Sequence, residues 1–304
     1  MKNSSRREFI KSSVGLMAIS QSIPFLDWVK NNAKLSFSTL GCPDWTFDKI
    51  LEVASKNGYK GIEIRGIQRQ LDLPLCPEFA NEAAIKLSNQ KIKDKNLLIV
   101  DLGSSANLHF ADATKRKENL GGAKRFIELA EKIHCPFVRV FPNDLPKDQE
   151  EKQTIDLIIS GLNELGDFAK GSGVKVLLES HGKVIYKDLL LKIMQASESN
   201  NVGLIWDVWN MWSVTKEPVA QVYETLKKYI LHTHIKDGIF ENEKPKYVLL
   251  GQGVSPLVES IALLQKGGYQ GYYSFEWEKM WHPEIEDPEI AIPHYAENFG
   301  KLFF

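Results

Sequence analysis

The chain has 304 residues, of which 43% are hydrophobic and 25% charged, and its net charge at pH 7 is −1. This length allows one large core or two smaller ones, and the composition is that of an ordinary globular protein. A net charge so close to zero argues against a nucleic-acid-binding protein, which usually carries a strong basic excess.

The first 30 residues resemble an export signal. A twin arginine at residues 6–7 precedes Phe9 and Lys11, and residues 14–20 form a short, mildly apolar stretch. The stretch is too short to span a bilayer, but it fits the apolar part of a signal peptide. Residues 1–30 are therefore predicted to be a twin-arginine signal peptide, which the twin-arginine export machinery would read to place the folded protein in the periplasm. The alternative is a basic N-terminus on a cytoplasmic enzyme.

From Lys34 onward, strand-like and helix-like segments alternate. The strand-like segments are short apolar runs, and the helix-like segments repeat their apolar residues every three or four positions. This alternation predicts a parallel sheet covered by helices, and eight such units favour a closed (β/α)₈ TIM barrel, forming a single α/β domain at residues 34–304. The predicted strands are 35–40, 61–65, 97–102, 137–141, 174–179, 202–207, 230–234 and 272–276, and the predicted helices are 46–57, 77–94, 115–134, 150–170, 186–197, 218–229, 255–266 and 288–301.

The last four predicted strands each end in a carboxylate or an imidazole. Glu179 ends the fifth strand, Asp207 the sixth, His234 the seventh and Glu276 the eighth. The carboxyl ends of the strands meet at the mouth of a TIM barrel, so these side chains are expected to converge there. Three carboxylates and one imidazole suit one divalent metal ion, Mn²⁺, Mg²⁺, Co²⁺ or Zn²⁺. His232 faces the same side of its strand as His234, so the pattern alone does not choose between them.

Two of the expected ligands also suggest a chemistry. A metal ion that holds a hydroxyl and a neighbouring carbonyl of a sugar makes the carbon between them acidic. Glu179 and Glu276 flank the expected site from two different strands, so we expect them to be the catalytic acid–base pair, acting from opposite faces of the sugar.

Five short segments resemble the xylose-isomerase-like TIM barrel superfamily, also described as the sugar phosphate isomerase/epimerase family. The resemblance covers the chain from about Leu35 to the C-terminus and implies a small carbohydrate substrate. It also implies the four strand-end residues as metal ligands, with His234 rather than His232 on the metal, and Glu179 and Glu276 as the proton-transfer pair. The segments are 61–65 (GIEIR), 178–182 (LESHG), 206–210 (WDVWN), 232–237 (HTHIKD) and 275–278 (FEWE).

The chain departs from the ketose 3-epimerases of this group at two positions. Those enzymes carry His three residues after the metal-binding Asp, where this chain has Asn210, and Arg shortly after the metal-binding His, where it has Lys236. We therefore expect His181 to be a further acid or base and Lys236 and Asn210 to contact substrate, although Lys236 would otherwise be an exposed charge at the rim. Arg139 and Glu63, also at strand ends, would either pair across the barrel or bind substrate.

The residues favour a divalent-metal-dependent sugar isomerase or epimerase that removes a proton next to a carbonyl of a sugar or keto-sugar. The alternative is a periplasmic metal-dependent lyase or dehydratase that cleaves a 3-keto-glycoside by β-elimination, which begins with the same proton abstraction. Phosphodiester hydrolysis, as in the endonuclease IV-type members, would need more ligands on the early strands than Glu63, Asp101 and His109 provide. A third possibility is a sugar-binding barrel without activity.

Overall fold

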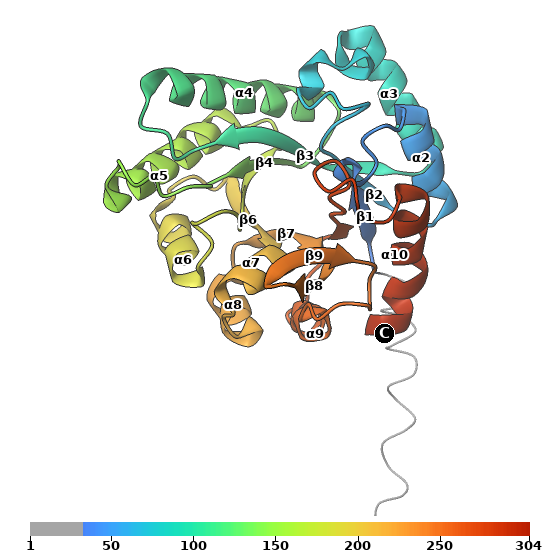
Figure 1. Ribbon diagram of the computed structural model, residues 1–304. Coiled ribbons are helices and arrows are strands. Elements are labelled where there is room, and N and C mark those ends of the chain that lie inside the picture. The colour runs from blue at the N-terminus through green and yellow to red at the C-terminus, as the bar shows by residue number, and fades with distance from the viewer. Residues whose placement is uncertain (1–32) are drawn as a thin grey trace, which may run out of the picture. The chain divides into compact units, whose positions relative to one another are not determined.

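Eight parallel strands close into a barrel, and helices connect them on the outside (Figure 1). The structure, a computed structural model, describes residues 33–304, so the signal peptide predicted at residues 1–30 lies outside the described residues. Around the barrel the strand order is β1-β10-β7-β6-β5-β4-β3-β2, and the predicted single-domain TIM barrel is confirmed. The barrel strands are β1 (Leu35–Ser38), β2 (Gly61–Ile64), β3 (Leu98–Asn107), β4 (Phe137–Phe141), β5 (Lys175–Glu179), β6 (Val202–Asp207), β7 (Ile230–Ile235) and β10 (Tyr273–Phe275).

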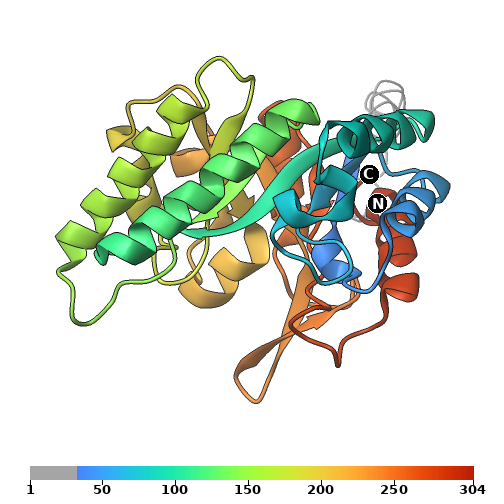
Figure 2. The same ribbon diagram turned by 90° about the horizontal axis from the view of Figure 1, so that it is seen from above.

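The outer helices begin where the sequence supplies caps. Thr46, Asn81 and Asp112 each accept a hydrogen bond from the backbone N–H three residues further on, which satisfies a donor at the start of the helix. In Figure 2, α4 and α5 lie side by side along one flank of the barrel. The helices are α2 (Phe47–Lys56), α3 (Glu82–Asp94), α4 (Ala113–Lys132), α5 (Glu151–Phe168), α6 (Lys187–Ala196), α7 (Val208–Thr215), α8 (Val219–Leu226), α9 (Leu257–Lys266) and α10 (Pro288–Phe303), with 3₁₀ turns at Thr39–Gly41, Leu73–Leu75 and Pro77–Phe79. Within residues 33–304, none of these helices has both the length and the hydrophobicity to cross a bilayer.

Two features of the chain were missed by the sequence analysis. Helix α7 begins directly after Asp207, which caps it by accepting a hydrogen bond from the backbone N–H of Asn210. An antiparallel hairpin of β8 (Asp237–Glu241) and β9 (Lys244–Val248) follows β7 and extends away from the barrel in Figure 2. Much of the hairpin is exposed and polar, so it lacks the apolar run that identified the barrel strands.

The carboxylate of Asp237 fastens the loop that follows this hairpin. Its Oδ1 accepts hydrogen bonds from the N–H groups of Gly238 at 2.9 Å and Ser255 at 3.2 Å. Its Oδ2 accepts from Gly251 and Gly253, each at 2.9 Å. A Cβ atom on Gly253 would lie 2.1 Å from Oδ1 of Asp237, so this close approach requires glycine. The loop between β9 and α9 is thereby held at the carboxyl end of β7, beside the barrel mouth.

Candidate metal centre

Side chains from four neighbouring strands meet at the carboxyl end of the barrel. Glu179 ends β5, Asp207 ends β6, His234 lies in β7 and Glu276 directly follows β10. All four are buried, and one possible ligand atom from each lies within 4.8 Å of those of the others. The structure therefore brings together the four residues that were expected to bind a metal.

The charges of this cluster fit a divalent cation. Nδ1 of His234 lies 3.2 Å from Oε1 of Glu179 and 3.3 Å from Oε2 of Glu276, and 3.8 Å from Oδ2 of Asp207. Burial alone would lower the pKa of His234, but the surrounding carboxylates, with Glu276 first, raise it well above its usual value. The imidazole thus takes up a proton that offsets the carboxylate charge. A hard divalent ion would neutralise the same charge, and carboxylate oxygens with one imidazole nitrogen are suitable ligands.

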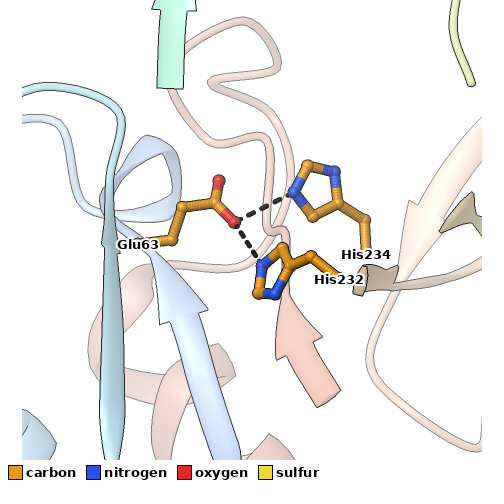
Figure 3. A group of neighbouring side chains, drawn as sticks. All are labelled: Glu63, His232 and His234. Atoms are coloured by element: carbon orange, nitrogen blue, oxygen red, sulfur yellow. Dashed lines mark hydrogen bonds and ion pairs between the residues drawn. The ribbon is translucent and has the colours of Figure 1, made fainter. Parts of the chain in front are cut away.

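Glu63, on β2, orients the imidazole of His234 from the opposite side. Its Oε2 accepts hydrogen bonds from Nε2 of His234 at 2.9 Å and from Nε2 of His232 at 3.2 Å (Figure 3). The hydroxyl of Ser274 donates to the same oxygen at 3.2 Å. Burial opposes the charge on Glu63, but the two imidazoles hold its pKa below the usual value. Because Nε2 of His234 is committed to Glu63, Nδ1 is the nitrogen that faces the other three candidate ligands.

Replacing Glu63 by glutamine is expected to weaken divalent-metal binding by about 10–100-fold, which is typical when the hydrogen-bond partner of a metal-binding histidine is altered. Glutamine keeps the shape of the side chain but loses the negative charge that fixes the ring of His234. Isothermal titration of metal-free protein with Mn²⁺ measures the effect. An affinity equal to that of the unmodified protein would show that Glu63 does not support the site.

Arg139 pairs with a candidate ligand rather than with Glu63. Its Nη1 donates to Oε2 of Glu179 at 2.7 Å and lies 3.9 Å from Oε1 of Glu276, and its Nη2 donates to the carbonyl of Ser104 at 3.1 Å. The ion pair between Arg139 and Glu63, considered from the sequence, is therefore not formed. Burial and Glu276 disfavour the charge on Glu179, but Arg139 and His234 outweigh them and hold its pKa below the usual range. Arg139 thus keeps Glu179 ionised.

Lys236 is completely buried at the edge of the cluster, so the alternative of an exposed charge at the rim is wrong. Its Nζ lies 2.8 Å from Oδ2 of Asp207, 2.5 Å from Oε2 of Glu276 and 2.6 Å from Oε1 of Glu278. Burial would lower the pKa of Lys236, but these carboxylates, with Asp207 first, raise it well above its usual value. The hydroxyl of Tyr247, on β9, donates to Oε1 of Glu278 at 2.8 Å. A positive charge therefore borders the candidate centre.

A chain of amides fixes Nδ1 of His181 as a hydrogen-bond donor. Nδ1 of His181 lies 2.7 Å from Oδ1 of Asn143. Nδ2 of Asn143 donates to Oδ1 of Asn107, whose own Nδ2 donates to the carbonyl of Ser105. A carbonyl only accepts, so the direction of every bond in the chain follows, and Nδ1 of His181 must be the donor. In the imidazole tautomer with a single proton on Nδ1, Nε2 is the acceptor.

The other residues that the sequence analysis considered for the site, Asn210, Asp101 and His109, make fewer contacts with the candidate ligands. The backbone N–H of Asn210 donates to Oδ1 of Asp207 at 2.8 Å, while its half-buried side chain forms no hydrogen bond within the described part of the chain. Asp101 and His109 were considered for a phosphodiesterase centre. Among residues 33–304, neither belongs to a group of side chains whose ligand atoms lie close enough to share a metal ion. Burial, and then Glu63, raise the pKa of Asp101 well above its usual value.

Three residues at the mouth were not identified from the sequence as site residues. Glu278 follows Glu276 by two positions, and Arg65 follows Glu63 by two. Side chains two positions apart in an extended chain point to the same side, so this spacing could have identified both residues. Tyr247 lies on the hairpin that the sequence analysis missed, and no pattern in the sequence pointed to it.

The comparisons with known proteins agree with this fold. Residues 51–297 match the family model described as Xylose isomerase-like TIM barrel. An inosose isomerase from Halalkalibacterium halodurans is 24% identical over 244 residues, which cover 78% of this chain and 83% of that protein. An inosose dehydratase from Serratia proteamaculans is 23% identical over 299 residues, covering 87% of this chain and 94% of that protein. The solved structure of the IOLI protein with a zinc atom has a TM-score of 0.74 at 20% identity, covering 89% of this chain and 99% of that one.

Proposed function

Because the chain belongs to the xylose isomerase-like TIM barrel family, we propose that it is a divalent-metal-dependent isomerase or epimerase that moves a proton next to a carbonyl of a sugar or keto-sugar. The observation that carries the proposal is the position of two ionised carboxylates, Glu179 and Glu276, 3.2 and 3.3 Å from the same nitrogen of His234. Mn²⁺, Mg²⁺, Co²⁺ or Zn²⁺, held by Glu179, Asp207, His234 and Glu276, would supply a Lewis acid for the substrate oxygens.

The two carboxylates are suited to act as a pair. Glu179 comes from β5 and Glu276 from the end of β10, with β6 and β7 between them in the barrel. A substrate between them would lose a proton to one carboxylate and regain a proton from the other, or from the same one at the neighbouring atom. Arg139 keeps Glu179 ionised, and His234 and Lys236 hold the pKa of Glu276 well below its usual value against the effect of burial. Both groups therefore start as bases.

The alternative function is a periplasmic lyase or dehydratase that expels a group from a 3-keto-glycoside after the same proton abstraction. Lys236 favours it, because an ammonium 2.5 Å from the base Glu276 would stabilise the negative charge of a departing oxygen. His181, whose Nε2 has no hydrogen-bond partner among residues 33–304, would serve as a second acid or base near Glu179. The similarity to both an inosose isomerase and an inosose dehydratase supports either outcome.

Incubation in D₂O with a panel of free ketoses, inososes and 3-keto-glycosides separates the two functions. An isomerase or epimerase incorporates deuterium next to the carbonyl and keeps every substituent. A lyase releases the leaving group and forms an unsaturated ketone. Deuterium exchange without loss of the leaving group from any keto-glycoside would exclude the lyase, and release without a rearranged sugar would exclude the isomerase. The Glu276→Gln protein serves as the inactive control in both assays.

A further inference from the structure

Arg65 is a buried cation at the barrel mouth that lacks a negative partner. It follows β2 directly and is only 6% exposed. Its Nη1 donates to the carbonyl of Gly103 at 3.3 Å and its Nη2 to the hydroxyl of Ser105 at 2.9 Å. Within residues 33–304, no Asp or Glu oxygen lies within 4.0 Å of its nitrogens. Buried charges in proteins are normally paired, so this arrangement calls for an explanation.

The other buried arginine and lysine at the mouth follow the usual rule. Arg139 lies 2.7 Å from Glu179, and Lys236 contacts three carboxylates. The protein therefore places carboxylates beside both of these buried side chains. Arg65 is the exception among the buried cations of the described barrel mouth.

Among the charges that act on Arg65, the one with the largest effect is repulsive. A Cβ atom on Gly103 would lie 2.8 Å from Cδ of Arg65 and 3.0 Å from Nη2 of Arg139, so both arginine side chains pack against this glycine. Burial, and second to it the charge of Arg139, lower the pKa of Arg65 to about 9. The carboxylates of Glu276, Glu179 and Glu63 raise this pKa, but their effects are smaller. The guanidinium of Arg65 would therefore gain from an additional negative charge.

The position of β2 in the barrel places Arg65 across the mouth from the candidate metal ligands. In the ring of eight strands, β2 is the fourth strand from β6, which carries Asp207, and so lies opposite to it. Arg65 follows Glu63 by two residues, and thus lies one layer closer to the mouth on the same face of the strand. A substrate whose carbonyl end lies at the candidate ligands would direct its other end towards Arg65.

We propose that Arg65 is a specificity-determining residue that binds an oxyanion of the substrate, a carboxylate or a phosphate, at the β2 side of the mouth. The planar guanidinium matches two oxygens of either group in a bidentate pair. The inference rests on the proposed function, because it describes the far end of a substrate whose carbonyl end is held at the candidate metal centre. It narrows the substrate class to keto-sugar acids or keto-sugar phosphates.

The test compares the unmodified protein with Arg65→Gln and Arg65→Lys on matched neutral ketoses, keto-sugar acids and keto-sugar phosphates. Arg65→Gln is expected to lower kcat/KM by about 10–100-fold for the anionic substrates, as for a lost hydrogen bond to a charged group, and by less than about threefold for the neutral ones. Arg65→Lys keeps the charge but loses the bidentate geometry. Its kcat/KM for the anionic substrates should therefore lie between those of the unmodified protein and Arg65→Gln. Comparison of kcat/KM for the keto-sugar acids and the keto-sugar phosphates shows which oxyanion is preferred.

A binding measurement keeps the inference separate from the proposed function. Calorimetry with glucuronate and with glucose 6-phosphate, which carry the oxyanion but need not react, is expected to show binding that Arg65→Gln abolishes. The control variant is Arg69→Gln, an exposed arginine that pairs with Asp44 in the same region, and it should bind as the unmodified protein does. Equal losses for neutral and anionic ligands would overturn the inference and show that Arg65 only supports β3. Anion binding without turnover of any substrate would instead refute the proposed reaction and leave Arg65 as an oxyanion site.

Discussion

Replacing Glu276 by glutamine is expected to slow turnover by about 10²–10⁴-fold, the range usually lost with a general acid or base. Glutamine keeps an oxygen in the same place but cannot accept a proton, so the loss should persist when the assay contains saturating metal. The rate of deuterium incorporation from D₂O, measured by NMR on whichever substrate the panel identifies, reports the proton transfer directly.

The matched control for this variant is Glu284→Gln. Glu284 is an acidic residue of the loop that follows Glu276, its side chain is 63% exposed, and its nearby partner is the exposed His282. We expect this substitution to leave the exchange rate unchanged. If Glu276→Gln also exchanged within about threefold of the unmodified protein, Glu276 would not be one of the proton-transfer groups.

Replacing Lys236 by methionine is expected to lower the free energy of unfolding of the metal-free protein by about 3–5 kcal/mol, which is typical of removing one partner from a buried ion pair. The substitution leaves Asp207, Glu276 and Glu278 without the ammonium that lies within 2.8 Å of each of them. Denaturant unfolding of the two metal-free proteins measures the loss. Added Mn²⁺ should recover part of it, because the cation supplies positive charge to the same carboxylates.

A surface lysine provides the comparison. Lys49 pairs with Glu289 at 2.6 Å, but the two side chains are 44% and 55% exposed, so Lys49→Met should cost no more than about 1 kcal/mol. A loss for Lys236→Met no larger than this would mean that the buried ammonium does not neutralise the cluster.

The barrel and the four converging strand ends were predictable because both follow from local periodicity. A short apolar run that ends in Glu179 or Asp207 is visible in the sequence, and the rule that parallel strands end at one edge brings such residues together. Helix α7 was missed because Asp207 ends β6 and caps the helix at once, with no loop between them. The hairpin after β7 was missed because its strands are polar.

The partners of the buried polar residues could not be predicted, because they depend on how the barrel closes. Glu63 and His234 are 171 residues apart in the chain and meet only because β2 and β7 face the same interior. The sequence left open whether Glu63 would pair with Arg139, and the competition between several carboxylates for the same cations decided against it. Lys236 follows β7, and only the fold shows that β9 and the end of β10 cover it.

The central claim is that Glu179, Asp207, His234 and Glu276 bind one divalent metal ion. The most direct test is elemental analysis of purified, dialysed protein for the unmodified chain and for Glu179→Gln and His234→Ala, with Glu284→Gln as the control. We expect about one divalent ion per chain in the unmodified and control proteins, and a large loss in the other two, because each removes one of few ligands. Unchanged metal content in Glu179→Gln and His234→Ala would contradict the claim.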